Sequence, residues 1–260
     1  MDSLTFVTEP LVGEIYKNFS GKYLPSDAGS KVNALNISSH FNSSLSGGID
    51  SINHANLLAG PLRTGNKIFN LNSSADKDKR AISVYTLKNG TKPGSAIGIE
   101  INDDVNSIIF LHACASEGNN KKAYDEIYNF KETAELLGWY EIIYEDGFVE
   151  TVPIRYGMNI LDWHWRKRII NNERARVKYN QNKYAYQASA VECSREKSEP
   201  VSFFAFEWEN TRFGKQIKEI NLKAVNYGKN NENAIILLAV SITENKKVAD
   251  VKGTERQFIQ

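Results

Sequence analysis

Residues 140–147, Tyr-Glu-Ile-Ile-Tyr-Glu-Asp-Gly, are followed at 149–154 by a second run rich in β-branched residues. Both runs contain the β-branched and aromatic residues that β-strands favour. Gly147 stands at the position where a tight turn between two strands requires a positive φ. We therefore expect an antiparallel hairpin over residues 140–154.

Short runs of the same kind recur along the chain and are separated by clusters of Asn, Ser and Gly, which favour turns. Residues 81–87 and 95–101 alternate apolar and polar, and Asn89-Gly90 between them is a typical hairpin turn. Residues 107–115 are almost continuously apolar, as in a strand that is buried on both faces. Further strands are expected at 201–208, from Ile217 to Leu222, and at 234–242. This series predicts an all-β fold, an antiparallel sandwich or barrel.

One stretch competes with this pattern. Residues 121–137 contain helix formers with apolar residues at helical spacing, and Gly138 follows as a C-cap. A short helix inserted between two strands and a stretch without a helix are equally expected there. Because no internal repeat or linker divides the chain, we expect a single domain over residues 1–260. Residues 1–31 would form an N-terminal strand or arm, and residues 245–260 a surface tail or the start of a linker.

The charge balance bears on partners and location. The chain has 32 Lys and Arg against 31 Asp and Glu, which gives no overall field to attract nucleic acid or an anionic membrane. No apolar run approaches the roughly 18 residues needed to cross a bilayer. We therefore expect neither a nucleic-acid nor a membrane partner. The first twenty residues do not form a signal peptide, so a cytoplasmic location is expected. The location would be extracellular or at the cell surface if the chain is excised from a larger exported enzyme.

Motifs for catalysis are missing from the sequence. It contains no dinucleotide-binding, P-loop, zinc-protease or nucleophile-elbow motif, and its four histidines have no metal-ligand spacing. His112 lies between apolar residues and is expected to be a satisfied core histidine. Cys114 and Cys193 lie in strand-like runs and are expected to be buried, inert thiols. These observations predict that the protein is not an enzyme.

Two charged features leave alternatives open. Glu207 and Glu209 flank Trp208 on one strand face, and paired carboxylates are the signature of glycoside hydrolysis. A chain with 31 acidic residues offers such pairs by chance, so solvated carboxylates are favoured over a polysaccharide-active enzyme. The basic run 166–168, with tryptophans beside it, could bind single-stranded nucleic acid. In a chain that is almost neutral, a solvated loop is the favoured interpretation.

Residues 154–166, Ile-Arg-Tyr-Gly-Met-Asn-Ile-Leu-Asp-Trp-His-Trp-Arg, carry the most informative mixture of side chains. Aromatic faces can cover the apolar C–H patches of a sugar ring, while planar polar groups bond its hydroxyls. Five residues of this segment are the predicted ligand-binding residues: Arg155, Asp162, Trp163, His164 and Trp165. The equal alternative is that Trp163 packs on the sandwich core as a plug and Trp165 covers a loop.

The order of these segments resembles a jelly-roll β-sandwich module of the galactose-binding-like kind, which is appended to bacterial glycoside hydrolases. The resemblance covers roughly residues 82–243, and it rests on residues 108–113, 138–147, 152–160, 162–163, 208–212, 217–220 and 234–243.

This resemblance implies a non-catalytic jelly-roll sandwich that binds a polysaccharide or oligosaccharide, or supports a glycoside hydrolase catalytic domain. It implies no cofactor beyond the structural calcium that many such modules hold. It transfers no binding residue, because loops carry specificity on such scaffolds. A structural domain that packs against a catalytic domain without binding sugar is the alternative.

Overall fold

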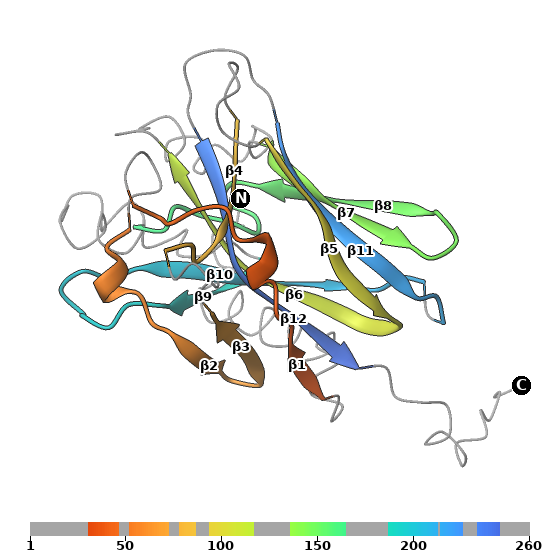
Figure 1. Ribbon diagram of the computed structural model, residues 1–260, viewed down its shortest axis with the longest axis horizontal. Coiled ribbons are helices and arrows are strands. Elements are labelled where there is room, and N and C mark those ends of the chain that lie inside the picture. Colours follow the sequence, from red (N-terminus) through yellow and green to blue (C-terminus); the bar gives the residue numbers. More distant parts are fainter. Residues whose placement is uncertain are drawn as a thin grey trace, which may run out of the picture.

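The protein is an antiparallel β-sandwich (Figure 1). The computed structural model describes residues 31–46, 52–72, 78–86, 94–116, 136–164, 187–212, 214–225 and 233–244. Within these residues the only helical elements are two 3₁₀ turns, Ser38–His40 and His54–Asn56. The all-β prediction is confirmed. No helix in the described part of the chain is both long enough and apolar enough to cross a membrane.

Twelve strands are described. They are β1 Val32–Ala34, β2 Gly60–Thr64, β3 Lys67–Leu71, β4 Ile82–Tyr85, β5 Ser95–Asp103, β6 Val105–Ser116, β7 Leu136–Tyr144, β8 Val149–Arg155, β9 Ala188–Glu192, β10 Ser202–Glu209, β11 Ile217–Ala224 and β12 Asn233–Glu244.

The strand order is that of a jelly roll. One sheet contains the series β4-β12-β6-β10, and the facing sheet contains β5-β11-β7-β8. The chain passes from one sheet to the other between β4 and β5, β5 and β6, β6 and β7, β8 and β9, β10 and β11, and β11 and β12. This alternation produces two four-stranded antiparallel series, the arrangement of the eight-stranded jelly roll. We call them the β6 sheet and the β7 sheet.

The β6 sheet is extended at both edges. β9 pairs with β10, and β1 pairs with the second half of β12 at Ser241–Thr243. β4 pairs with the first half of β12, at Ala234–Leu237, so β1 and β4 share one edge of this strand. β12 therefore lies inside the sheet along its whole length, which explains why 11 of its 12 residues are buried.

The hairpin predicted over residues 140–154 is confirmed. β7 and β8 pair in antiparallel register from Leu136 opposite Arg155 to Ile143 opposite Val149. Gly147 in the turn has a φ of 82°, in the left-handed region that glycine enters without steric cost. The Arg212 guanidinium binds Asp146 in this turn, donating to both carboxylate oxygens at 3.0 and 2.8 Å.

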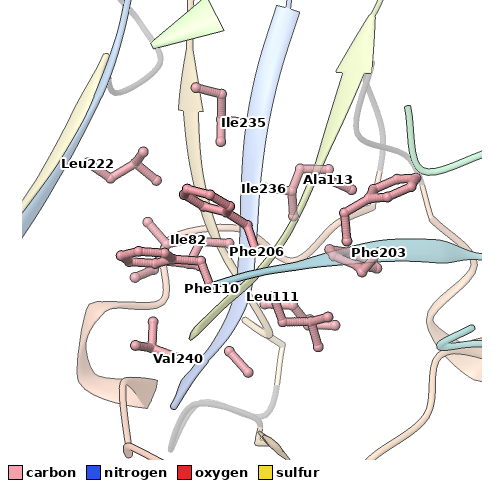
Figure 2. Packing of buried hydrophobic residues seen from close by; sticks show 14 of the residues in the cluster. Ile82, Phe110, Leu111, Ala113, Phe203, Phe206, Leu222, Ile235, Ile236 and Val240 are labelled. Carbon is pink, nitrogen blue, oxygen red and sulfur yellow. The ribbon is translucent and has the colours of Figure 1, made fainter. Parts of the chain in front are cut away.

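The main core lies between the two sheets. The ring of Phe110 in β6 stacks on Tyr140 of β7 with their centroids 3.8 Å apart, so alternate β6 residues point toward the β7 sheet. Figure 2 shows Phe110, Phe206 and Ile235 on the side of the β6 sheet that faces Leu222 of β11.

A second core lies on the opposite face of the β6 sheet. Leu111, Ala113 and Phe203 point away from the β7 sheet (Figure 2) and are nevertheless fully buried. Residues 37–46 and 52–72 cover them, since the Ser241 hydroxyl on this face donates to the Ile68 carbonyl oxygen of β3 at 2.5 Å. Buried apolar residues of these two segments complete the layer: Ile37, Phe41, Leu45, Ile52, Leu57, Phe69 and Leu71.

The alternative of a short helix over residues 121–137 is wrong at its end. Leu136 and Leu137 belong to strand β7, and Gly138 lies inside that strand instead of capping a helix. Residues 121–135 lie outside the described residues. Most of the expected N-terminal arm, residues 1–30, and the expected tail, residues 245–260, also lie outside them, as does the expected turn at Asn89-Gly90.

Candidate functional site

An open face with a tryptophan lies on the side of the β7 sheet that points away from the core. The register places Trp139 of β7 between Lys223 of β11 and Pro153 of β8. In the next row, Glu141 lies between Asn221 and Thr151. We call these six residues the outer face: Trp139, Glu141, Thr151, Pro153, Asn221 and Lys223. Thr151 and Pro153 are exposed, so this face is open to solvent.

Glu141 is the centre of a hydrogen-bonded group on the outer face. Its Oε1 accepts from Lys223 Nζ at 2.7 Å and from Trp139 Nε1 at 3.2 Å. Its Oε2 accepts from Asn221 Nδ2 at 3.2 Å. The Asn221 Oδ1 in turn accepts from the backbone N–H of Gly98 in β5 at 2.9 Å. The indole therefore leans along β7 toward Glu141, and the polar groups are fixed by hydrogen bonds that link β7 to β11 and β11 to β5.

This group also sets the charge state of Glu141. Burial alone would raise the pKa of this carboxyl, but the hydrogen bonds from Lys223, Asn221 and Trp139 and the charge of Lys223 lower it below the ordinary value. Glu141 is thus a carboxylate at neutral pH and acts as an acceptor only. A partly exposed aromatic ring beside fixed donors and acceptors is the combination that recognises a sugar ring.

The structure brings together three of the five ligand-binding residues that the sequence predicts. Asp162 is fully buried and forms a bridge with Cys114 of β6. Its Oδ1 accepts from the backbone N–H of His164 at 3.0 Å and also contacts the Nδ1 of that side chain. The Trp163 and His164 rings stack with their centroids 4.0 Å apart.

Trp163 packs against the hydrophobic core at the end of the β6 sheet. Its backbone N–H donates to the Cys114 carbonyl oxygen, and its own carbonyl oxygen accepts from Ser202 N–H. The indole Nε1 is buried without an acceptor among the described residues. This packing matches the interpretation of Trp163 as a plug on the sandwich core.

The other two predicted residues lie elsewhere. Arg155 is half-buried at the end of β8, where its backbone N–H donates to Asn159 Oδ1 at 2.9 Å. The Asn159 Nδ2 donates to the Pro153 carbonyl oxygen, which closes this loop on itself. Trp165 lies outside the described residues, as does the basic run at 166–168.

The expectation that Glu207 is a solvated carboxylate is wrong. Hairpin β2–β3 covers it, and its Oε2 lies 3.1 Å from Lys67 Nζ, with the two side chains only 6% and 9% exposed. Its Oε1 accepts from Ser107 Oγ at 2.7 Å. Burial and the charge of Glu207 together raise the pKa of the neighbouring Glu209. Glu207 thus joins hairpin β2–β3 to the β6 sheet.

The expectation of a satisfied core histidine is confirmed for His112, which lies between the sheets. Its Nε2 contacts the carbonyl oxygen of Asn159 at 2.9 Å, and a carbonyl can only accept, so Nε2 carries the proton. Its Nδ1 therefore accepts from the Tyr140 hydroxyl at 2.8 Å. Complete burial lowers the pKa of His112 from 6.5 to about 4.

We expect the neutral state of His112 to make folding pH-dependent. The unfolded chain takes up this proton near pH 6.5, whereas the folded chain takes it up only near 4. The unfolded state binds more protons between these values, so stability is retained above pH 6.5 and falls as the pH drops toward 4. The loss is about 3 kcal/mol. Urea midpoints of wild type and His112→Gln at pH 7.5, 5.5 and 4.5 test this, since an equal fall in both proteins would contradict it.

Both cysteines are free and buried, as expected of inert thiols. Burial raises the pKa of the Cys193 thiol to about 12, so the reactive thiolate does not form near neutral pH. Among the described residues no group of three or more His, Cys, Asp or Glu side chains could hold a metal ion.

The outer face was missed by the sequence reasoning, although part of its signal is local. Trp139 and Glu141 are two positions apart in a strand, so they project to the same side. Their partners Asn221 and Lys223 lie about 80 positions further along, and only the register of β7 with β11 reveals them. No protein-family model, no curated protein and no solved structure matches this chain.

Proposed function

We propose that this protein is a non-catalytic jelly-roll module that binds a polysaccharide or oligosaccharide. The observation that carries the proposal is the outer face, where the partly exposed Trp139 ring lies beside three polar side chains locked together by hydrogen bonds. Groups held in this way lose little conformational freedom when a ligand binds. The antiparallel sandwich and the resemblance to glycoside hydrolase modules support the same proposal.

Two groups that catalysis could use are already engaged within the structure. Glu207, one of the two carboxylates that a polysaccharide-active enzyme would use, is held by Lys67 and Ser107 beneath hairpin β2–β3. His112 has both ring nitrogens engaged inside the core. If the chain is part of an exported polysaccharide-degrading enzyme, this module would act outside the cell and direct that enzyme to its substrate.

Replacement of Trp139 tests the site. We expect Trp139→Ala to weaken binding to the polysaccharide that the wild-type protein binds. The expected loss is about 2 kcal/mol, which corresponds to a roughly 30-fold higher Kd. Affinity electrophoresis through gels containing single polysaccharides identifies the ligand, and calorimetry measures Kd. Phe148→Ala is the matched control, because it removes another exposed aromatic ring, at the β7–β8 turn.

The results also separate the two candidate sites. Binding that is retained in Trp139→Ala and lost in Trp163→Ala would assign recognition to the segment 155–164 and contradict the outer face. If a folded wild-type protein binds no polysaccharide in a broad panel, the binding function itself is contradicted.

A second function is favoured by exposed apolar residues at the two edges of the β7 sheet. Ile97 in β5 is 65% exposed, and the adjacent Phe148 and Val149 at the β7–β8 turn are 49% and 46% exposed. Such residues are typical of a surface that packs against another domain. This observation favours the alternative of a structural module that supports a glycoside hydrolase catalytic domain without binding sugar.

A further inference from the structure

We propose that the outer face selects uncharged glycans and excludes acidic ones. This inference rests on the proposed carbohydrate-binding function and specifies its ligand. It follows from the charges and the spare hydrogen-bonding capacity of the described residues on and beside this face.

Each lysine at this face is already paired. Lys223 Nζ lies 2.7 Å from Glu141, and Lys218 Nζ lies 3.9 Å from Glu219 in the adjoining part of β11. A uronate or sulfate group would have to take Lys223 away from Glu141. That exchange would leave the Glu141 carboxylate partly buried without its cation, which costs free energy.

The next row of the same sheet adds negative charge. Glu219 of β11 lies directly opposite Glu100 of β5 in the register. With Glu141, this side of the β7 sheet carries three glutamates, against Lys218, Lys223 and the half-buried Arg155 at the end of β8. An acidic glycan placed across the strands would meet these carboxylates as like charges, and repulsion of this kind disfavours a wrong partner.

Sugar hydroxyl groups match the hydrogen-bond donors and acceptors of the outer face that are still unused. Lys223 uses one of its three N–H donors on Glu141, and Asn221 uses one of its two. Glu141 has about four acceptor positions, of which the described donors occupy three. Spare donors and a spare acceptor therefore lie side by side next to the Trp139 ring. A sugar hydroxyl can donate and accept at once, so it can use both.

The proposed selection of uncharged glycans is tested by measuring how the whole chain binds neutral and acidic polysaccharides at low and at high salt. The neutral probes are an arabinoxylan, a galactomannan and a mixed-linkage glucan, and the acidic probes are polygalacturonate and a sulfated galactan. We expect at least one neutral probe to bind with a Kd that changes less than about twofold between 20 and 500 mM NaCl, because no counterions are released. We expect that binding to fall about tenfold or more in Trp139→Ala, and no acidic probe to bind.

A charge variant makes the exclusion testable directly. In Glu100→Gln/Glu219→Gln we expect acidic probes to gain measurable, salt-sensitive affinity, while affinity for the neutral probe stays within about twofold. Glu196→Gln, at an exposed glutamate outside the β7 sheet, is the matched control and should leave both unchanged.

The outcomes distinguish the two proposals. Tight, salt-sensitive binding of an acidic probe by wild type, lost in Trp139→Ala, would overturn the selection of neutral glycans and leave the carbohydrate-binding function standing. A folded protein that binds neither class of polysaccharide would overturn both.

Discussion

Gly138→Ala is expected to destabilise the protein by about 3 kcal/mol or more, or to prevent it from folding. Gly138 lies in β7, close to β11 in the same sheet and to β12 in the facing sheet. An added Cβ would lie 2.2 Å from the Lys223 carbonyl oxygen of β11 and 2.6 Å from Ile235 Cδ1 of β12 in the facing sheet. The nearer atom belongs to the backbone, so rotation of a side chain cannot relieve the contact.

Urea unfolding measures this effect, with Gly94→Ala as the matched control. A Cβ at Gly94 would have its nearest contact at 3.7 Å, from the Tyr85 carbonyl oxygen, so we expect a change within about 0.5 kcal/mol. Ile235→Val in the Gly138→Ala background removes only the side-chain contact and should restore little stability. A Gly138→Ala midpoint equal to that of wild type would contradict the close approach of the strands.

Lys67→Met is expected to cost about 3 to 5 kcal/mol, since it removes one partner of a buried ion pair. Glu207 would then be a buried carboxylate without its cation, although Ser107 still donates to it. Urea midpoints of wild type and variant at pH 7.5 measure this loss, and equal midpoints would contradict it.

The double variant Lys67→Met/Glu207→Met separates the charge effect from packing. Replacement of both partners by apolar side chains should recover most of the loss, because no buried charge remains. Urea midpoints of the wild type, the two single variants and the double variant close the cycle. Additive losses in the double variant would contradict coupling between Lys67 and Glu207.

The strands of the sandwich could be predicted from the sequence because their patterns are local. The alternation at 95–101 and the apolar run at 107–115 lie within β5 and β6, and Gly147 has the positive φ that the turn requires. Residues 136–137 were ambiguous because two adjacent leucines fit a helical and an extended pattern equally well.

Other elements depend on distant partners. Strands β1 and β9 have three and five residues, too few for a clear period, and they exist because β12 and β10 offer free edges. The cover formed by residues 37–46 and 52–72 was missed for a related reason. Its buried residues, such as Ile37 and Phe41, are scattered among polar ones and meet only on the surface of the β6 sheet.

The same distinction applies to the candidate sites. The segment 154–166 attracted a prediction because its aromatic and polar residues are adjacent in the sequence. In space Asp162 is fully buried and Trp163 packs on the core. The residues of the outer face are instead far apart in the sequence. Lys223 and Glu141 are separated by 82 positions and meet only through strand pairing. Composition over a short window cannot reveal such a group.

The place of β12 in the β6 sheet determines when this protein can fold during synthesis. β12 is the last strand in the sequence among those described, yet it lies between β6 on one side and β1 and β4 on the other. Until the ribosome has released residues 233–244, three strands lack their partner and expose unpaired backbone N–H and C=O groups. Folding must therefore follow translation of almost the whole segment, and it must close loops of more than 100 residues. A nascent chain of this design needs protection from aggregation until its central strand arrives.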